Sequence, residues 1–420
     1  MHNHDFKDPR RDLKPETAVL NTGYDDRLSE LSIRPPVFLT STFGFRNAAE
    51  GAMHFQRAYH LPGNDGADPG LIYARINNPN IEMLEHKMTA VEAGANFAAA
   101  FPSGMSAITT AMLALLPWDA TVLYTDPVYG GTYFFLEHLG ARFGIKATAV
   151  DTSDLAKVAT ALRAAPKPFD LVLIETPANP TMTLTDIEGV VNLVKEYDDK
   201  TLVMVDNTFL GPVFQQPFNL GADIVVYSAT KFIGGHSDLI AGIVLTRTKA
   251  HMTPIKDYRS ILGATVSPFA AWQMIRSLDT LFMRMRQQAV HATKVAEALA
   301  VHPKVARVIF PALLKAKDGA AYATYYKQCS GPGSTMSFVL KQDDWESAQR
   351  LLDSLELCHL AVSLGGVETL IEHPRRMTHS DMSEADLDRC GISDGMIRLS
   401  VGLEDPSDLI KDLYKGLEKV

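Results

Sequence analysis

The chain contains a series of short apolar segments that alternate with helix-forming ones, and this alternation constrains its fold more than any other feature. The strand-like segments are TVLYTD, KATAVD, FDLVLIETP, TLVMVDNT, ADIVVYSAT and AGIVLT. Several of them are apolar almost throughout, which is typical of strands covered by helices on both faces. The alternation therefore predicts an α/β domain with a mostly parallel sheet between about residues 80 and 270.

Three further segments have helical patterns. In NPNIEMLEHKMTAVEAG, apolar residues recur at helical spacing from Ile81 to Val91, and Gly94 is placed to end the helix. FPSGMSAITTAMLALL predicts a helix that starts at about Ser103. A long, partly broken helical segment, SPFAAWQMIRSLDTLFMRMRQQAVHATKVAEALAVHP, leads to a second lobe, where we expect STMSFVL and MIRLSVGLED as strands and WESAQRLLDSL as a helix.

Composition limits the classes of function. A chain of 420 residues can bury a large core and should form two or more lobes. Its net charge of -9 argues against nucleic acid as a partner, and no run of eighteen apolar residues suggests a membrane span. The polar N-terminal segment has no apolar signal core, so a cytoplasmic location is expected. Cys329, Cys358 and Cys390 fit neither a disulfide framework nor a metal cluster, and we predict no metal site.

One lysine lies in a chemically distinctive setting. Lys231 in SATKFIGGHSD closely follows Ser228 and Thr230, and Asp206 ends the strand-like segment upstream. A neutral lysine amine can condense with an aldehyde cofactor, and a fixed carboxylate can keep the ring nitrogen of that cofactor protonated. Hydroxyls and loop amides can hold a phosphate. These residue types together predict a pyridoxal phosphate site, although a lysine among small polar residues is by itself more often a solvated loop residue.

Ten ordered motifs carry a resemblance to a known family. The chain resembles the Cys/Met metabolism (trans-sulfuration) enzymes, which are pyridoxal phosphate proteins of fold type I, over nearly its whole length. The motifs are RPPVFLTSTF, YARINNPN, FPSGMSAI, DPVYGGT, ETPANP, VDNTF, SATKFIGGHSD, SLGGVETLIEHP, MTHS and GMIRLSVGLED.

The resemblance implies a fold and a division of the chain. The fold is aspartate-aminotransferase-like, with a seven-stranded type of mostly parallel sheet, helices on both faces and a smaller α+β C-terminal domain. Residues 1–75 would be an arm reaching the neighbouring subunit, 76–275 the cofactor-binding domain and 276–420 the small domain. The implied assembly is a tetramer, a dimer of active dimers.

The resemblance also implies a role for each cofactor residue. Lys231 would form the Schiff base and move protons between substrate carbons, Asp206 would pair with the pyridine nitrogen, and Asn179 would contact the ring oxygen with Glu175 supporting the site. The phosphate would be held by Ser103, Gly104, Met105, Ser228 and Thr230 from the same subunit and by Tyr73 and Arg75 from its neighbour.

On the substrate side, the resemblance implies that Tyr129 stacks on the cofactor and protonates the leaving group, while Ser363 and Arg398 bind the substrate carboxylate. Two positions depart from the family pattern. Methionine γ-lyases carry a cysteine where this chain has Gly131, and cystathionine enzymes carry a glutamate where it has Val362. Absence of a side chain at residue 131 is expected to leave room for a bulkier or more polar leaving group.

These features predict a lyase that performs γ-elimination on an L-amino acid. The pattern is similar to canavanine γ-lyases, a branch of the family, so L-canavanine, giving homoserine and hydroxyguanidine, is the first expectation. The loop at about 56–70 lies close to the expected site mouth, where Asp65, Asp68 or another acid would meet the guanidine. Methionine or cystathionine γ-elimination, γ-replacement on an O-acylhomoserine and a catalytically silent cofactor-binding oligomer remain alternatives.

Overall fold

The six strand segments expected from the sequence all form, and they lie in one seven-stranded sheet. The structure is a computed structural model, and it describes residues 13–63 and 69–420. Its strand order is β1-β7-β6-β5-β4-β2-β3. The strands are β1 (Phe97–Phe101), β2 (Thr121–Thr125), β3 (Lys146–Val150), β4 (Leu171–Glu175), β5 (Leu202–Asp206), β6 (Ile224–Tyr227) and β7 (Gly242–Thr246).

The sheet is mostly parallel, as predicted, with one reversed strand. Strands β6, β5, β4, β2 and β3 pair in parallel, whereas β7 runs antiparallel to both β6 and β1. Strand β1 was not among the expected strands, because FAAAF lacks β-branched residues. It is nevertheless buried, and its pairing with β7 places it at the end of the sheet.

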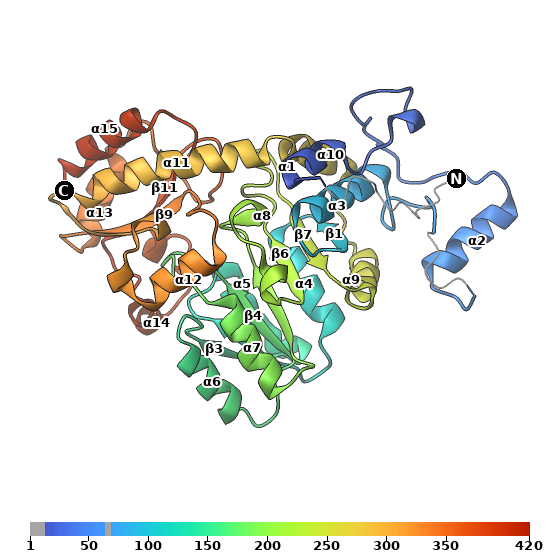
Figure 1. The fold of residues 1–420 in the computed structure, drawn as a ribbon, viewed down its shortest axis with the longest axis horizontal. Helices are drawn as coiled ribbons and strands as arrows, with labels where there is room; N and C mark the ends of the chain where they lie inside the picture. Colours follow the sequence, from blue (N-terminus) through green and yellow to red (C-terminus); the bar gives the residue numbers. More distant parts are fainter. Residues whose placement is uncertain (1–12, 64–68) are drawn as a thin grey trace.

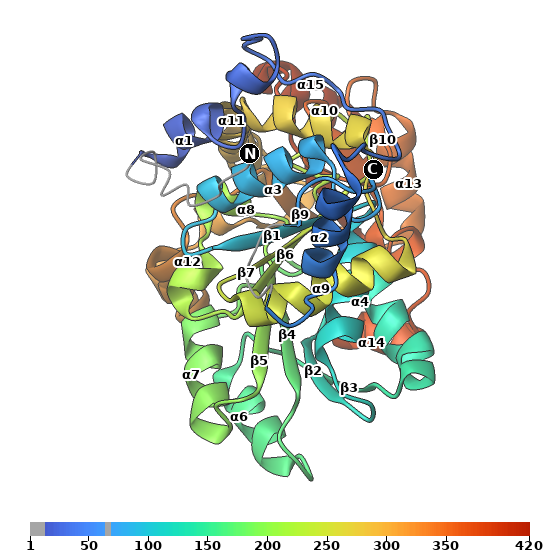
Figure 2. The same ribbon diagram turned by 90° about the vertical axis from the view of Figure 1, so that its right-hand side faces the viewer.

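Helices cover both faces of this sheet, so successive strand residues enter different cores. In β5, Val203 and Val205 pack in the core made with α3 (Pro79–Val91), α7 (Ile187–Tyr197) and α10 (Pro268–Leu278). Met204 packs in the core made with α4 (Gly104–Leu115) and α9 (Lys249–Leu262). Figure 2 shows α6 and α7 on one side of the strands and α4 and α9 on the other. This two-sided burial explains why the strands read as continuous apolar segments.

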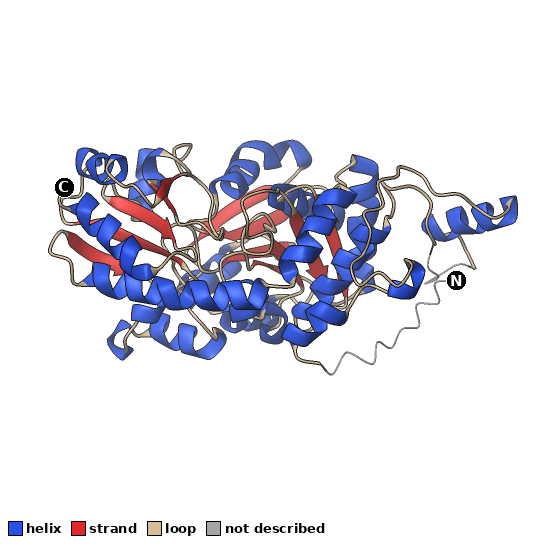
Figure 3. Cartoon of the chain, turned by 90° about the horizontal axis from the view of Figure 1, so that it is seen from above, coloured by secondary structure: helices blue, strands red, loops and turns tan. Residues whose placement is uncertain are grey.

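A second, smaller sheet follows in the C-terminal part of the chain, with the order β10-β11-β12-β9-β8. Its strands are β8 (Val305–Ile309), β9 (Thr335–Leu340), β10 (His359–Leu360), β11 (Leu370–Glu372) and β12 (Met396–Ser400). The expected strands at STMSFVL and MIRLSVGLED are β9 and β12, and the expected helix at WESAQRLLDSL is α13. Figure 3 shows the two groups of strands one after the other along the molecule.

The helix α11 joins the two sheets (Figure 1). Leu281, Met285 and Ala289 in its first half pack in a core of the large sheet, whereas Ala292 and Leu299 in its second half pack in the core of the small sheet. The broken helical segment predicted there is α10 and α11, which are separated at Asp279 and Thr280. The domain boundaries at residues 75 and 275 stay predictions.

The helices are α1 (Pro15–Asn21), α2 (Ala48–Ala58), α3 (Pro79–Val91), α4 (Gly104–Leu115), α5 (Gly130–Phe134), α6 (Leu155–Ala164), α7 (Ile187–Tyr197), α8 (Gly211–Phe214), α9 (Lys249–Leu262), α10 (Pro268–Leu278), α11 (Leu281–Ala300), α12 (Ala320–Gln328), α13 (Trp345–Asp353), α14 (Glu384–Arg389) and α15 (Pro406–Leu417). Short 3-10 segments are η1 (Asp26–Leu28), η3 (Gly140–Phe143), η4 (Pro217–Leu220), η5 (Pro311–Leu313), η6 (Ala316–Asp318) and η7 (Pro374–Arg376), and η2 (Phe135–Leu139) is a π-helix.

The N-terminal arm is more regular than the sequence suggested, because it contains α1 and α2. Helix α1 packs on α3, whereas α2 extends away from both sheets (Figure 1). Apolar side chains between these helices face solvent, among them Leu31, Ile33 and Leu39. In the part of the chain that the structure describes, no helix has the length and apolar character needed to cross a membrane.

Candidate active site

Lys231 lies in the turn after β6, at the carboxyl end of the parallel strands, where ligands of such sheets bind. Its Nζ donates to Oγ of Ser363 at 2.8 Å. Burial, with the Arg398 guanidinium as the second cause, lowers the pKa of the Lys231 amine to about 8, although Glu372 opposes the shift. A lysine with this pKa is neutral far more often than a solvated one, and the neutral amine is the nucleophile.

Two carboxylates end neighbouring strands beside this lysine turn. Glu175 at the end of β4 pairs in register with Asp206 at the end of β5. Oδ1 of Asp206 accepts from N and Oγ1 of Thr208 at 3.0 and 2.6 Å. Glu175 accepts from the backbone N–H groups of Tyr129 and Asn179 at 3.0 and 2.8 Å. Burial raises the pKa of both carboxyl groups, and for Glu175 the charge of Asp206 is the second cause.

The start of α4 faces the loop that carries Lys231. Oγ of Ser103 caps this helix by accepting from N–H of Ser106 at 3.0 Å, as the sequence predicted. A Cβ atom at Gly104 would lie 2.9 Å from Cβ of Ser228, so a glycine is needed for the two loops to meet. Helix N-terminal amides and a serine hydroxyl thus converge, which is the donor set that binds phosphate.

Thr230 and Met105 contribute less directly in this arrangement. The Thr230 hydroxyl donates to the carbonyl of Ala241 at 3.2 Å and accepts from its N–H at 3.0 Å. The Thr230 hydroxyl proton is therefore already engaged in a hydrogen bond to the backbone. The contact of Thr230 with the phosphate stays a prediction. Sδ of Met105 lies against α5, where it accepts from Oγ1 of Thr132 at 3.9 Å.

Arg398 is held by a buried polar network that sequence reasoning did not find. Its Nη1 contacts Oε1 of Glu372 at 2.8 Å and Oδ1 of Asn179 at 3.0 Å, and its Nη2 donates to the carbonyl of Ser363 at 2.8 Å. Glu372 in β11 pairs in register with Arg398 in β12. A lone acid in the apolar segment TLIEHP was the signal for this partner, because an arginine within an apolar strand needs one. The network orients the guanidinium beside Lys231.

The Tyr129 ring lies over Gly131, which changes the interpretation of that glycine. A Cβ atom at residue 131 would lie 2.7 Å from Cε1 of Tyr129 and 3.1 Å from Sδ of Met105. The expectation that Gly131 leaves empty space is therefore wrong at this point, because the tyrosine ring occupies it. Burial, followed by the charge of Glu175, raises the pKa of the Tyr129 phenol, so the group stays protonated and can donate.

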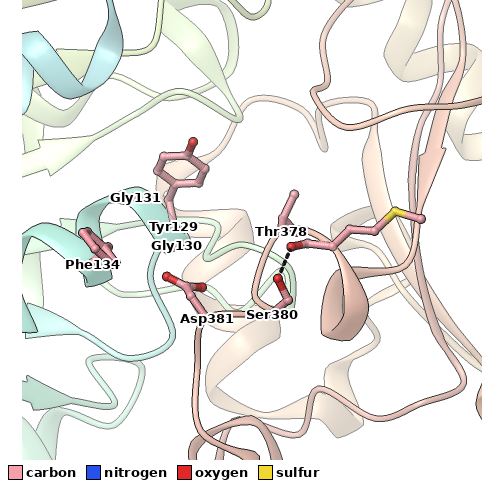
Figure 4. Close-up of a pocket in the computed structure, with 8 residues that line it drawn as sticks. Tyr129, Gly130, Gly131, Phe134, Thr378, Ser380 and Asp381 are labelled. Atoms are coloured by element: carbon pink, nitrogen blue, oxygen red, sulfur yellow. Dashed lines mark hydrogen bonds between the residues drawn. The ribbon is translucent and has the colours of Figure 1, made fainter. Parts of the chain in front are cut away.

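A pocket of about 370 Å³ opens beside Tyr129, between α5 and the loop that precedes α14 (Figure 4). Its walls comprise Tyr129, Gly130, Gly131, Phe134, Met377, Thr378, Ser380 and Asp381. Val362 is 57% exposed and does not line this pocket. The last four wall residues lie in and just after the MTHS motif, which the sequence analysis matched to the family without giving it a role.

Tyr73 and Arg75 contact each other and α9 within the chain. Nη1 of Arg75 donates to the carbonyl and Oγ of Ser260 in α9, at 2.8 and 3.1 Å. The Arg75 guanidinium also lies 5.8 Å from the ring centroid of Tyr73, which is 42% exposed. Asp65 and Asp68, the acids expected at the site mouth, lie outside the described residues.

Three comparisons place this geometry in a family. The model of the Cys/Met metabolism PLP-dependent enzymes matches residues 16–418. An L-methionine gamma-lyase of Fusobacterium nucleatum subsp. polymorphum is 41% identical over 386 residues, which cover 92% of this chain and 93% of that protein. The cystathionine gamma-lyase of Homo sapiens is 36% identical, with 96% and 93% covered.

A solved structure is also similar. The cystathionine gamma synthase from Xanthomonas oryzae pv. oryzae, in complex with aminoacrylate and cysteine, matches with a TM-score of 0.87 and 33% identity, covering 97% of this chain and 98% of that one. The similarity to the relatives and to this structure extends over nearly the whole chain, so both the large and the small sheet are included.

The residues of this site fit pyridoxal phosphate. The Lys231 amine has the low pKa that attack on an aldehyde needs, and the start of α4 meets Ser228 in a phosphate-binding arrangement. Two adjacent buried carboxyl groups with raised pKa values would be stabilised as anions by a cationic ring nitrogen. The chain therefore belongs to the Cys/Met metabolism PLP-dependent enzymes, a fold-type I family, and it is a pyridoxal-phosphate-dependent enzyme with lyase activity.

Proposed function

We propose that this lyase catalyses γ-elimination from L-canavanine, giving hydroxyguanidine and, after addition of water, homoserine. In this reaction the bond between the γ carbon and oxygen breaks, and the oxygen leaves with the guanidine. The oxygen of water then becomes the γ hydroxyl of homoserine. The observation that carries the proposal is the position of Tyr129, which lines the pocket and whose protonated phenol is close to the charges of Glu175 and Arg398.

Each side chain of the site has a separate role in this reaction. Arg398 and Ser363 bind the substrate carboxylate, with Glu372 and Asn179 holding the guanidinium in place. Bound pyridoxal phosphate supplies the electron sink that acidifies the α and β carbons. Lys231 takes the α proton and then acts at the β carbon, for which an amine with a pKa of about 8 is suited. Tyr129 gives its proton to the departing group.

Two alternatives keep the same site residues. Methionine or cystathionine γ-elimination is favoured by the names of the relatives, but this chain lacks both the thiol at residue 131 and the acid at residue 362. A γ-replacement on an O-acylhomoserine is favoured by the similar cystathionine gamma synthase structure. The carboxylate of Asp381 in the pocket wall favours a leaving group richer in hydrogen-bond donors than a methylthio group.

A comparison of specificity constants tests the proposal. The purified holoenzyme is assayed in one buffer with canavanine, methionine, cystathionine and O-acetylhomoserine, and products are identified by mass. We expect kcat/KM to be highest for canavanine. If methionine or cystathionine exceeds canavanine tenfold, which is about 1.4 kcal/mol in transition-state binding, canavanine is not the substrate. Capture of an added thiol would instead support γ-replacement.

We also propose that Tyr73 and Arg75 serve the active site of a neighbouring subunit in a tetramer. The support is the contact of Arg75 with Ser260 of α9, the exposed ring of Tyr73 and the solvent-facing apolar residues of the arm. Mixing inactive Arg75→Ala with inactive Lys231→Ala protein should restore some activity, because hybrid assemblies then contain sites with both native residues. No recovery, despite subunit exchange verified by mass spectrometry, would contradict a shared site.

A further inference from the structure

The pocket beside Tyr129 contains one charged side chain, the carboxylate of Asp381. The two aliphatic hydroxyls in its wall have partners, because Thr378 donates to Oε1 of Glu372 at 2.9 Å and Ser380 donates to the carbonyl of Met377 at 3.0 Å. Asp381 is exposed, and within residues 13–63 and 69–420 it forms no hydrogen bond or ion pair. A charged group without a structural partner at a pocket wall is available to a ligand.

The neighbouring acids contrast with Asp381. Asp386 pairs with Arg389 at 2.5 Å, and Asp388 pairs with Arg375 at 2.9 Å. Both carboxylates therefore stabilise the α14 region, and neither lines the pocket. Asp381 is the acid of this segment that has no such structural role.

The Asp381 carboxylate lies close to the predicted leaving-group acid. Its Oδ1 lies 3.6 Å from where a Cβ atom at Gly130 would be, next to the first turn of α5. Its charge is the smallest of the causes that raise the pKa of the Tyr129 phenol, after burial and the charges of Glu175 and Asp206. Figure 4 shows the carboxylate at the α5 side of the pocket, together with Phe134 and Tyr129.

The loop that carries Asp381 is tied to the residue expected to bind the substrate carboxylate. Oε1 of Glu372 accepts from Thr378 at 2.9 Å and contacts Nη1 of Arg398 at 2.8 Å. One buried acid thus fixes both the loop and the guanidinium. The fold thus connects the loop of Asp381 to the guanidinium expected to bind the other charged end of the substrate.

We propose that Asp381 binds the guanidino group at the distal end of the substrate. The inference rests on the proposed function for its substrate class. A carboxylate accepts two parallel charge-assisted hydrogen bonds from a guanidine, and a methylthio group has no N–H or O–H with which to donate them. The distal end of cystathionine carries a carboxylate, which the same charge would repel, beside an ammonium group, which cannot match the two parallel bonds of a guanidine. Asp381 is then the acid that was expected to meet the guanidine at the site mouth.

Direct binding measurements test this role independently of turnover. L-arginine and L-citrulline differ at the distal group, which is cationic in arginine and neutral in citrulline. Dissociation constants for both are measured by calorimetry on the holoenzyme and on the variants Asp381→Asn and Asp408→Asn. Asp408 is a matched control, because it is an exposed acid in α15 that pairs with Lys411 at 3.2 Å.

We expect the native enzyme and Asp408→Asn to bind arginine about tenfold or more tightly than citrulline, and Asp381→Asn to lose this preference. For canavanine, Asp381→Asn should lower kcat/KM about 10- to 100-fold, mainly through KM, while values for methionine change less than about threefold. An equal preference for arginine in native protein and Asp381→Asn, or no preference in either, overturns the inference. Arginine selectivity that depends on Asp381, combined with poor canavanine turnover, overturns the proposed substrate alone.

Discussion

The strand-end carboxylates of the Lys231 site and the 377–381 loop form two walls of the region around Tyr129, yet they are built in opposite ways. Glu175 and Asp206 end parallel strands, are buried, and accept hydrogen bonds from neighbouring backbone. Asp381 lies on an exposed turn and has no partner in the described chain. The strand ends fix the groups that do chemistry, whereas an exposed turn presents the group that selects a ligand. Changes at the first wall should therefore affect rate, and changes at the second should affect substrate choice.

The substitution Lys231→Ala should have the largest effect, because it removes both the attachment point of the cofactor and the proton-transfer group. We expect loss of turnover for every substrate and loss of the visible absorbance of lysine-bound cofactor. The exposed Lys317→Ala serves as the control and should retain both. If turnover persists in Lys231→Ala and borohydride fixes the cofactor to another lysine, Lys231 is not the lysine that carries the cofactor.

Asp206→Asn should lower kcat about 10²- to 10³-fold for all substrates while leaving the cofactor bound, because a neutral amide stabilises a cationic ring nitrogen poorly. Cofactor content is measured by absorbance and turnover by product release. Since the amide keeps the side-chain shape, the circular dichroism of the protein should be unchanged. If Asp206→Asn turns over at nearly the native rate, the Asp206 carboxylate is not part of the catalytic machinery.

The pKa of Lys231 gives a pH prediction that needs no turnover. In cofactor-free protein, only the neutral amine reacts with acetic anhydride, so its labelling rate should rise about tenfold per pH unit below pH 8 and level off above it. Exposed lysines, measured by mass spectrometry in the same digest, should continue to gain reactivity above pH 9. If the labelling rates of Lys231 and of the exposed lysines depend on pH in the same way, burial does not lower the pKa of Lys231.

Gly131→Ala should have the smallest effect of the series, because it displaces a ring without removing a chemical group. The new methyl group would lie 2.7 Å from Cε1 of Tyr129, so the ring must move. We expect kcat to fall about threefold to tenfold, since misplacement of an acid slows the step it serves. Gly44→Ala is the matched control, because a Cβ atom there meets nothing within 4 Å. Equal kcat values for both variants would show that Gly131 does not position Tyr129.

Much of the large sheet could be predicted because its strands are apolar on both faces and end at polar residues. The same property hides strand direction, so the antiparallel course of β7 was not visible in AGIVLT, and FAAAF gave no strand signal for β1. Lys231, Asp206 and the Ser103 cap were recognised because each follows or starts a regular element. Glu372, Thr378 and Asp381 were missed because their roles depend on contacts between β11, β12 and a turn. Such contacts leave no periodic pattern in the sequence.

The helix α11 belongs to both hydrophobic cores, and this has a consequence for unfolding. Melting of either lobe would strip apolar contacts from one half of the helix, so the lobes should unfold as one cooperative unit. Calorimetry should therefore record a single transition, and two separated transitions would show that the lobes unfold independently. Lys231 comes from one lobe and Arg398 from the other. We therefore expect heating to separate the Lys231 amine and the Arg398 guanidinium in the same transition, so that activity is lost with that single transition.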